Sequence, residues 1–194
     1  MEYFTGLIPA IVGNWPVWVV TITLILAAVI DGFELKVPNW VTFPLVISGW
    51  VYSIAFAHTL GLTWYEGLGW SLFGTVVGLA LLMPAYAIGG MGAGDVKLLA
   101  GVGAWMHGEV TFYAFCITAI VGAVLAVLMV LARRAWKKHY AQFWMIAGEI
   151  LTLRNPEELS VIAAERKSSM LLLPYGIPIA IGTIMYFAWM GMLI

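Results

Sequence analysis

Residues 111–131 read TFYAFCITAIVGAVLAVLMVL, and this stretch decides the class of fold. It contains no Asp, Glu, Lys or Arg, and nearly every side chain is apolar. A helix needs about 20 such residues to cross the hydrocarbon core of a bilayer. The stretch is therefore predicted to be a transmembrane helix, and similar runs occur along the rest of the chain.

The composition of the whole chain agrees with that interpretation. Of its 194 residues, 63% are hydrophobic and 10% are charged, against about 25% charged in an average soluble domain. A soluble fold of this size leaves about 30% of its chain surface exposed, too much to hide so many apolar side chains. Disorder is excluded because it needs low hydrophobicity and high net charge. A polytopic membrane protein remains, and the net charge of −1 gives no nucleic-acid-binding footprint.

The apolar runs predict an all-α fold with six transmembrane helices. They lie at about Trp15–Ile30, Trp40–Leu60, Gly67–Ala87, Val96–Met106, Thr111–Leu131 and Leu171–Leu193. The fourth is short: it rises about 17 Å, less than the roughly 30 Å of a hydrocarbon core. Gly74 and Gly78 in the third have a spacing that permits close helix packing. No large extramembrane segment fits, so residues 1–194 are predicted to form a single membrane-embedded domain.

The basic residues predict the orientation in the membrane. If all six helices cross, every Lys and Arg falls on one side, which is then cytoplasmic, and both termini are external. The opposite side carries only Glu2, Glu66 and Glu109 as charged residues. If the short fourth helix did not cross, Lys36 and Lys97 would lie opposite the other basic residues, so the charge rule favours six crossings.

Residues 133–170 are the only sizeable polar segment. Its basic residues alternate with aromatic ones, a pattern typical of an amphipathic helix at the lipid headgroups. Residues 155–158, NPEE, have the pattern of a helix start, with Asn at the N-cap and Pro in the first turn. The segment is predicted to be a cytoplasmic, interfacial helical loop, and a role in binding a substrate or partner is left open.

The chain contains only two aspartates, and both are candidates for chemistry. Asp31 ends the first predicted helix, and Asp95 opens the fourth after a glycine-rich stretch, so both lie at the cytoplasmic ends of their helices. Ionisable groups at the membrane are costly and often functional. When two carboxyls share a site, the pKa of one rises. The ionised carboxylate can then take a proton from water while the protonated one donates.

A purely structural reading of the two aspartates stays open. Asp95 would stabilise the start of its helix through the helix dipole, whereas Asp31 stands at the unfavourable, C-terminal end of its own helix. Lys97 follows Asp95 by two residues, so the two side chains do not share a helix face. Lys97 is interpreted as a headgroup anchor or, alternatively, as a group that tunes the site.

Other chemistries find no support in the sequence. One cysteine and three scattered histidines give no metal-binding spacing, so no metal and no cofactor are predicted. There is no GxSxG nucleophile motif, and no glycine-rich loop carries a phosphate-binding lysine. A two-aspartate site with water as the nucleophile needs none of these groups.

Three motifs carry a family resemblance. Residues 91–105, MGAGDVKLLAGVGAW, resemble the GxGD segment of the type IV prepilin peptidases. Asp31 followed by VPNWVT at 37–42 is similar to that family's first aspartate region. LPYGIP at 173–178 resembles the start of its last helix. The motifs occur in the family's order along most of the chain.

The resemblance implies an aspartyl endopeptidase of the cell inner membrane. Such an enzyme removes the short basic leader of prepilins or pseudopilins at the cytoplasmic face, so pilus or secretion assembly proteins are further expected partners beside membrane lipid. Asp31 and Asp95 match the two catalytic aspartates. The residues expected to shape the site or meet substrate are Gly92, Gly94, Lys97, Pro38, Asn39 and Glu34. Glu34, one turn beyond Asp31, is expected to meet the charge of the leader.

The chain also departs from the larger members of that family. They carry an N-terminal region with CxxC motifs and methylate the new N-terminus, whereas this sequence has one cysteine, Cys116. N-methyltransferase activity is therefore not expected, and the chain resembles the short branch that processes Flp-type pilins of tight-adherence systems or, alternatively, the archaeal preflagellin peptidases. The alternative is a non-enzymatic membrane protein, a small transporter or a pilus-assembly component, that uses the aspartates as a proton or structural site. Peptide hydrolysis discriminates between the two.

Overall fold

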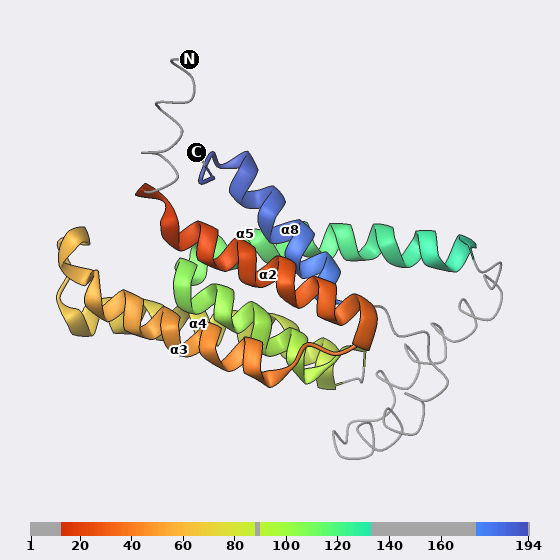
Figure 1. The fold of residues 1–194 in the computed structure, drawn as a ribbon, viewed down its shortest axis with the longest axis horizontal. Helices are drawn as coiled ribbons and strands as arrows, with labels where there is room; N and C mark the ends of the chain where they lie inside the picture. The colour runs from red at the N-terminus through yellow and green to blue at the C-terminus, as the bar shows by residue number, and fades with distance from the viewer. Residues whose placement is uncertain (1–12, 88–89, 133–173, 194) are drawn as a thin grey trace.

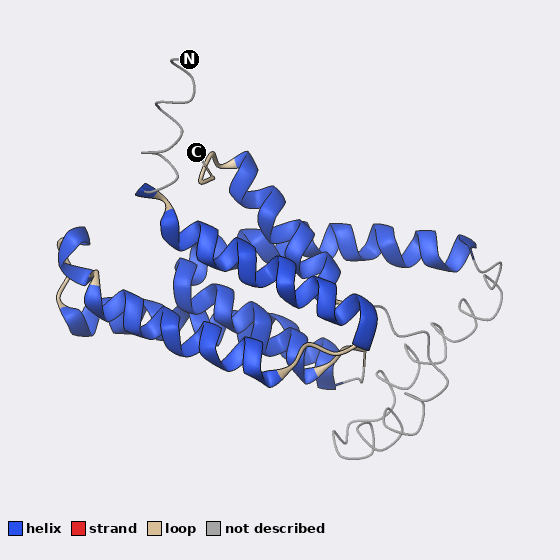
Figure 2. Cartoon of the chain, viewed as in Figure 1, coloured by secondary structure: helices blue, strands red, loops and turns tan. Residues whose placement is uncertain are grey.

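The computed structural model describes residues 13–87, 90–132 and 174–193, and every regular element in them is helical (Figure 2). The predicted all-α class is confirmed for these residues. The predicted loop at 133–170 lies outside them. The elements in chain order are α2 (Trp15–Glu34), α3 (Asn39–Ala55), the 3₁₀ helix η1 (Ala57–Leu60), α4 (Trp64–Ala87), α5 (Ala93–Ala132) and α8 (Gly176–Trp189).

The long element α5 consists of two helices joined by a kink at His107. His107 has φ 63° and ψ −179°, a region of backbone space populated essentially by glycine. The chain turns back at this point (Figure 1). The kink lies between the predicted fourth and fifth helices, so the sequence placed that break correctly. The first part, residues 93–106, carries Asp95.

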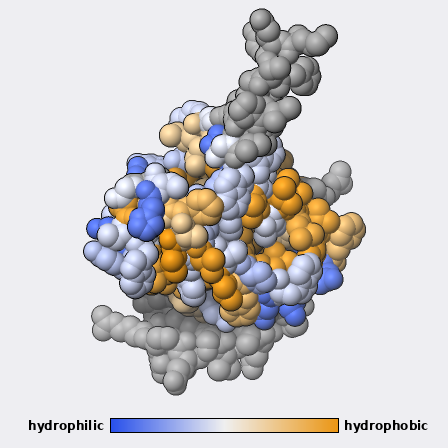
Figure 3. Space-filling model, turned by 60° about the vertical axis from the view of Figure 1, so that its left-hand side comes forward, coloured by the Kyte–Doolittle hydropathy of each residue, from blue (hydrophilic) through white to orange (hydrophobic). Residues whose placement is uncertain are grey.

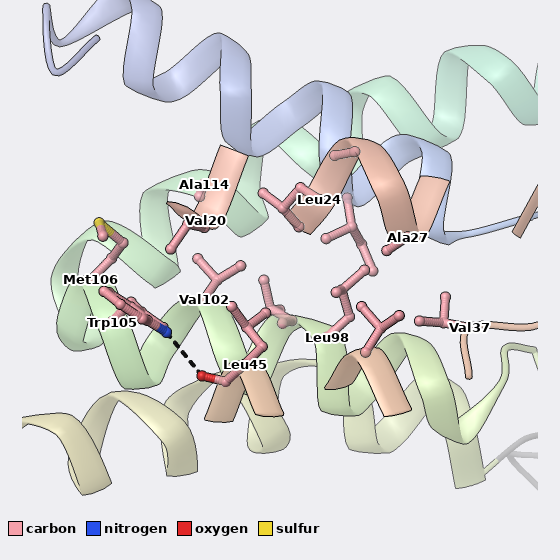
Figure 4. Packing of buried hydrophobic residues seen from close by; sticks show 14 of the residues in the cluster. Val20, Leu24, Ala27, Val37, Leu45, Leu98, Val102, Trp105, Met106 and Ala114 are labelled. Carbon is pink, nitrogen blue, oxygen red and sulfur yellow. Dashed lines mark hydrogen bonds between the residues drawn. The ribbon is translucent and has the colours of Figure 1, made fainter. Parts of the chain in front are cut away.

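Side chains from other helices bind the carbonyl groups before this kink. The Ser71 hydroxyl donates to the carbonyl oxygen of Ala104 at 2.5 Å, and the Ser53 hydroxyl lies 3.5 Å from the same oxygen. The Trp105 indole N–H donates to the carbonyl oxygen of Leu45 at 2.9 Å (Figure 4). The last carbonyls of a helix have no partner within it, so the serine hydroxyls of α3 and α4 stabilise this helix end, and the Trp105 bond attaches it to α3.

Replacing Ser71 by Ala is expected to lower the free energy of unfolding by about 1–2 kcal/mol. The Ala104 carbonyl would then keep only the longer contact with Ser53, inside the bundle. Thermal unfolding in detergent measures the effect. Ser48→Ala is the matched control, because Ser48 is exposed and its hydroxyl bonds only within its own helix. Equal melting temperatures for the two variants would contradict this role of Ser71.

Small residues let α4 and the first part of α5 pack backbone against backbone. A Cβ atom on Gly74 would collide with the carbonyl oxygen of Gly103, and one on Gly78 would lie 2.6 Å from the carbonyl oxygen of Leu99. The close packing predicted from the spacing of Gly74 and Gly78 is confirmed. Around this contact lies a core of buried aliphatic residues, among them Leu24 and Leu98 (Figure 4).

Much of the outer surface is apolar, as a bilayer requires. Figure 3 shows hydrophobic residues over broad areas of one face, and Ile22 and Val124 are examples of side chains more than half exposed. Among the residues that the structure describes, three stretches are long and apolar enough to cross a membrane: Trp15–Glu34, Trp64–Ala87 and Ala93–Met129, the last across the kink. Six crossings remain a prediction. Cys116 is exposed on this surface.

Several helix boundaries differ from the predicted ones. α2 continues to Glu34, so Asp31 lies inside its last turn, and Leu35 ends the helix in the left-handed conformation with φ 52°. α3 stops at Ala55, where the chain tightens into η1. α8 begins at Gly176, later than the predicted start at residue 171. The first of these differences matters for the site, because it places the Asp31 side chain within a regular helix.

Candidate active site

Several helix ends gather at one end of the bundle. α2 ends there, and α3, α5 and α8 begin there (Figure 1). Asp31 in the last turn of α2 is 2% exposed, and Asp95 in the first turn of α5 is 5% exposed. The structure therefore brings both aspartates to the same end of the molecule and buries both side chains.

The Asp31 carboxylate binds the start of a different helix. Its Oδ2 atom accepts a hydrogen bond of 2.7 Å from the backbone N–H of Gly176, the first residue of α8. A helix N-terminus attracts negative charge. Asp31 stands at the unfavourable C-terminal end of its own helix, but its carboxylate faces the favourable N-terminal end of α8.

The Asp95 carboxylate binds the start of its own helix. Oδ2 accepts a hydrogen bond of 3.0 Å from the Gly92 N–H, and the Asp95 N–H donates back to the Gly92 carbonyl at 3.2 Å. The first bond is the half of a capping box in which the N3 side chain accepts the N-cap N–H; the second is a backbone bond, because Gly92 has no side chain to complete the motif. Stabilising the start of α5 is thus one role of Asp95 that the geometry demonstrates, and it fixes the orientation of the carboxylate.

Gly94 joins the two aspartate regions. A Cβ atom at this position would collide with the carbonyl oxygen of Val37. Val37 is buried and lies in the short connection between α2 and α3. The chain after Asp31 and the chain around Asp95 therefore touch through their backbones. At Gly92 a Cβ atom would lie 3.2 Å from Oδ2 of Asp95, so a side chain there would press on the carboxylate.

Lys97 and Asn39 form a second link between the same regions. The Lys97 ammonium donates to the Asn39 side-chain oxygen at 3.0 Å and lies 4.8 Å from the centre of the Phe43 ring. Pro38 precedes Asn39 as the N-cap of α3. Pro38, Asn39 and Lys97, all predicted to shape the site, thus lie together. The Lys97 ammonium binds a side chain of the protein, whereas the sequence also allowed it to be a headgroup anchor. Glu34 is exposed on the last turn of α2, beside this group in sequence.

Tyr175 and Gly176 bring the start of α8 to the Asp31 carboxylate. Gly176 donates to Asp31, and the half-buried Tyr175 precedes it as the N-cap of α8. Tyr175 also lines a cavity of about 320 Å³ between α4, the second part of α5 and α8. Its other walls include Leu82, Met91, Phe115, Gly122 and Ile179. A mostly apolar cavity therefore reaches Tyr175, the residue before the Gly176 that binds Asp31.

This geometry is compatible with proton transfer between carboxyl groups and water. Both carboxylates are buried, and each accepts a backbone N–H that fixes one oxygen. Within the described ranges, no group of three or more His, Cys, Asp or Glu side chains gathers in a way that could hold a metal ion.

A model of the type IV leader peptidase family matches residues 18–127, more than half of the chain. The chain belongs to this family. The match extends from within α2 into the second part of α5 and includes both aspartates. The family resemblance seen in the sequence is thereby confirmed.

Curated members of the leader peptidase family are longer than this chain. The prepilin leader peptidase/N-methyltransferase of Aeromonas salmonicida is 26% identical over 171 residues, which cover 79% of this chain and 56% of that protein. The protein of the same description from Pseudomonas aeruginosa is 31% identical over 119 residues, 58% of this chain and 39% of its own. The chain spans about half the length of the curated relatives it matches. No solved structure matches it.

Two residues at the site of this leader peptidase family member were not predicted as site residues. Tyr175 and Gly176 were interpreted only as part of a helix start, and they lie outside the matched range. The sequence feature that could have indicated a close contact is the glycine between Tyr175 and Ile177, at the first turn of an apolar helix. The sequence alone does not say which side chain that glycine meets.

Proposed function

We propose that the chain is a prepilin leader peptidase of the aspartic type. The observation that carries the proposal is the burial of both aspartates at one end of the bundle, each held by a backbone N–H. Family membership supports a peptidase. Its substrates would be Flp-type or other type IV prepilins and pseudopilins, cut between the basic leader and the apolar helix.

In the proposed reaction, water attacks the carbonyl carbon of the scissile peptide bond. One carboxylate takes a proton from that water, and the other carboxyl, protonated, donates its proton to the leaving nitrogen as the C–N bond breaks. Asp31 and Asp95 are the pair, in either order. Gly92 and Gly94 add no side chains beside Asp95, so the substrate can come close to its carboxylate. Pro38, Asn39 and Lys97 shape the neighbouring segment of chain.

The proposed setting is the inner membrane, with the site at the cytoplasmic face and both termini outside. Residues 1–194 would act as one membrane-embedded peptidase domain, with residues 133–170 as a cytoplasmic helical segment. For residues 1–194 we propose leader cleavage without N-methyltransferase activity, since their one cysteine cannot form a CxxC motif. Pilus or secretion assembly proteins would be its further partners.

The test is cleavage by the purified protein. The protein in detergent is mixed with a short Flp-type prepilin, cleavage is followed by gel shift, and the cut is mapped by mass spectrometry. A double variant with both aspartates changed to Asn, purified in parallel, controls for contaminating proteases. A cut after the leader glycine, absent from the control, supports the proposal. Intact prepilin after incubation with folded protein would leave the aspartates as a proton or structural site.

Charge reversal at Glu34 is expected to weaken substrate binding. Glu34 is exposed at the same end as the aspartates, where its carboxylate can attract a basic leader. For Glu34→Lys we expect KM to rise several-fold at low salt with kcat unchanged, and the effect to shrink as salt screens the charges. Glu109→Lys, at an exposed position beyond the kink, is the control. Unchanged kinetics for Glu34→Lys would contradict the proposed contact between Glu34 and the leader.

A further inference from the structure

We propose that Gly176, at the start of α8, is a positioning residue for Asp31: its N–H holds the carboxylate, and its lack of a side chain makes room for it. The inference rests on the proposed peptidase function, which it deepens by naming a third residue of the site. Gly176 is buried, and its N–H lies 2.7 Å from Oδ2 of Asp31. That bond joins α2 to α8 across most of the length of the chain.

The space around Gly176 is filled by Asp31. A Cβ atom on Gly176 would lie 2.8 Å from Oδ2, 3.0 Å from Cβ and 3.1 Å from Cγ of Asp31. The contact with Oδ2 is shorter than real Cβ atoms make, and the contacts with Cβ and Cγ are tight enough to require a shift of a few tenths of an ångström. Because Cβ of Asp31 is fixed by the α2 backbone, rotating the carboxylate away would not relieve the whole clash. Alanine at 176 must therefore displace either Asp31 or the start of α8.

The same segment also lies near the chain that leads to the other aspartate. Tyr175 precedes Gly176 and lines a cavity together with Met91, four residues before Asp95. α8 packs on both α2 and α5. A shift of the α8 start would consequently move the partner of Asp31 and Tyr175 together. Gly176 thus sets the position of Asp31 relative to the rest of the site.

Gly32→Ala is a matched control for Gly176→Ala. Gly32 is adjacent to Asp31 in α2 but exposed, and a Cβ atom there would meet only the Ile177 side chain, at 3.7 Å, an ordinary contact distance. Both variants add one methyl group next to Asp31. Only the change at 176 points that group at the carboxylate.

The first experiment measures cleavage kinetics. Displacement of a reacting group by about 1 Å costs on the order of 100-fold in rate, so Gly176→Ala is expected to lower kcat about 100-fold and to leave KM within about two-fold. Gly32→Ala is expected to behave as the unchanged protein. Equal kcat values for the two variants, or a rise in KM alone, would overturn the proposal. Absence of cleavage by the unchanged protein would instead refute the peptidase function.

A second experiment does not depend on activity. Gly176→Ala is made in the unchanged chain and in an Asp31→Gly background, where the atoms that would clash are gone, and melting temperatures are compared as a double-mutant cycle. Gly176→Ala is expected to lower the melting temperature in the first background and to lower it by less than half as much in the second. Equal losses in both backgrounds would show that Gly176 does not position Asp31.

Discussion

Asn at position 31 or at position 95 is expected to reduce kcat for prepilin cleavage by about 100- to 10,000-fold. The amide has the shape of the carboxyl, and its oxygen can still accept the N–H of Gly176 or Gly92. It cannot take a proton from water or donate one as an acid does. The loss should therefore appear in kcat while the protein remains folded in detergent.

The double Asn variant sharpens this prediction. Residues that act as one unit lose little more when both are removed than when one is, so the double variant should be about as slow as each single one. Glu109→Gln, at an exposed position, controls for loss of a carboxylate. Normal processing by both single variants would refute the catalytic pair. A loss confined to Asp31→Asn would reduce Asp95 to its observed part in capping α5.

Gly74→Ala is expected to lower the stability of the fold strongly. The added Cβ would meet the Gly103 carbonyl and lie 2.8 Å from Cα of His107. Both are backbone atoms that cannot rotate away. Overpacking of this kind costs about 1–3 kcal/mol, and here the helices must move apart. A lower melting temperature in detergent, measured by loss of folded protein after heating, is the expected result.

Gly69→Ala provides the comparison for Gly74→Ala. Gly69 lies in the same helix, α4, and a Cβ atom there meets nothing within 4 Å. Alanine also has a higher helix propensity than glycine, by about 1 kcal/mol, so Gly69→Ala should leave stability unchanged or raise it. Equal melting temperatures for the two variants would show that α4 and α5 do not pack as closely as described.

The sequence predicted the local features of the fold well, because they depend on neighbouring residues. The break near His107, the close packing at Gly74 and the placement of both aspartates at helix ends follow from runs of apolar residues and their spacing. Helix ends were less certain: α2 runs on to Glu34 because Leu35, not a glycine, adopts the left-handed turn that ends it.

The partners of the site residues could not be predicted in the same way. The bond between Asp31 and Gly176 joins distant parts of the chain, and no spacing rule relates them. Helical geometry predicts that Lys97 and Asp95 do not share a face, but it could not predict that Lys97 donates to Asn39. Such pairings depend on how the helices pack, and the family resemblance suggested only which regions take part.

The kink at His107 has a mechanical consequence for the two aspartates. The part of α5 before it, which carries Asp95, packs on α3 and α4 through Gly49, Gly78 and Gly103, whereas the part after it packs on α8 through Gly182. Asp31 is tied to α8. One continuous element, α5, thus packs both on the helices around Asp95 and on the helix whose Gly176 holds Asp31, so a substitution that alters the kink would displace the surroundings of both carboxylates.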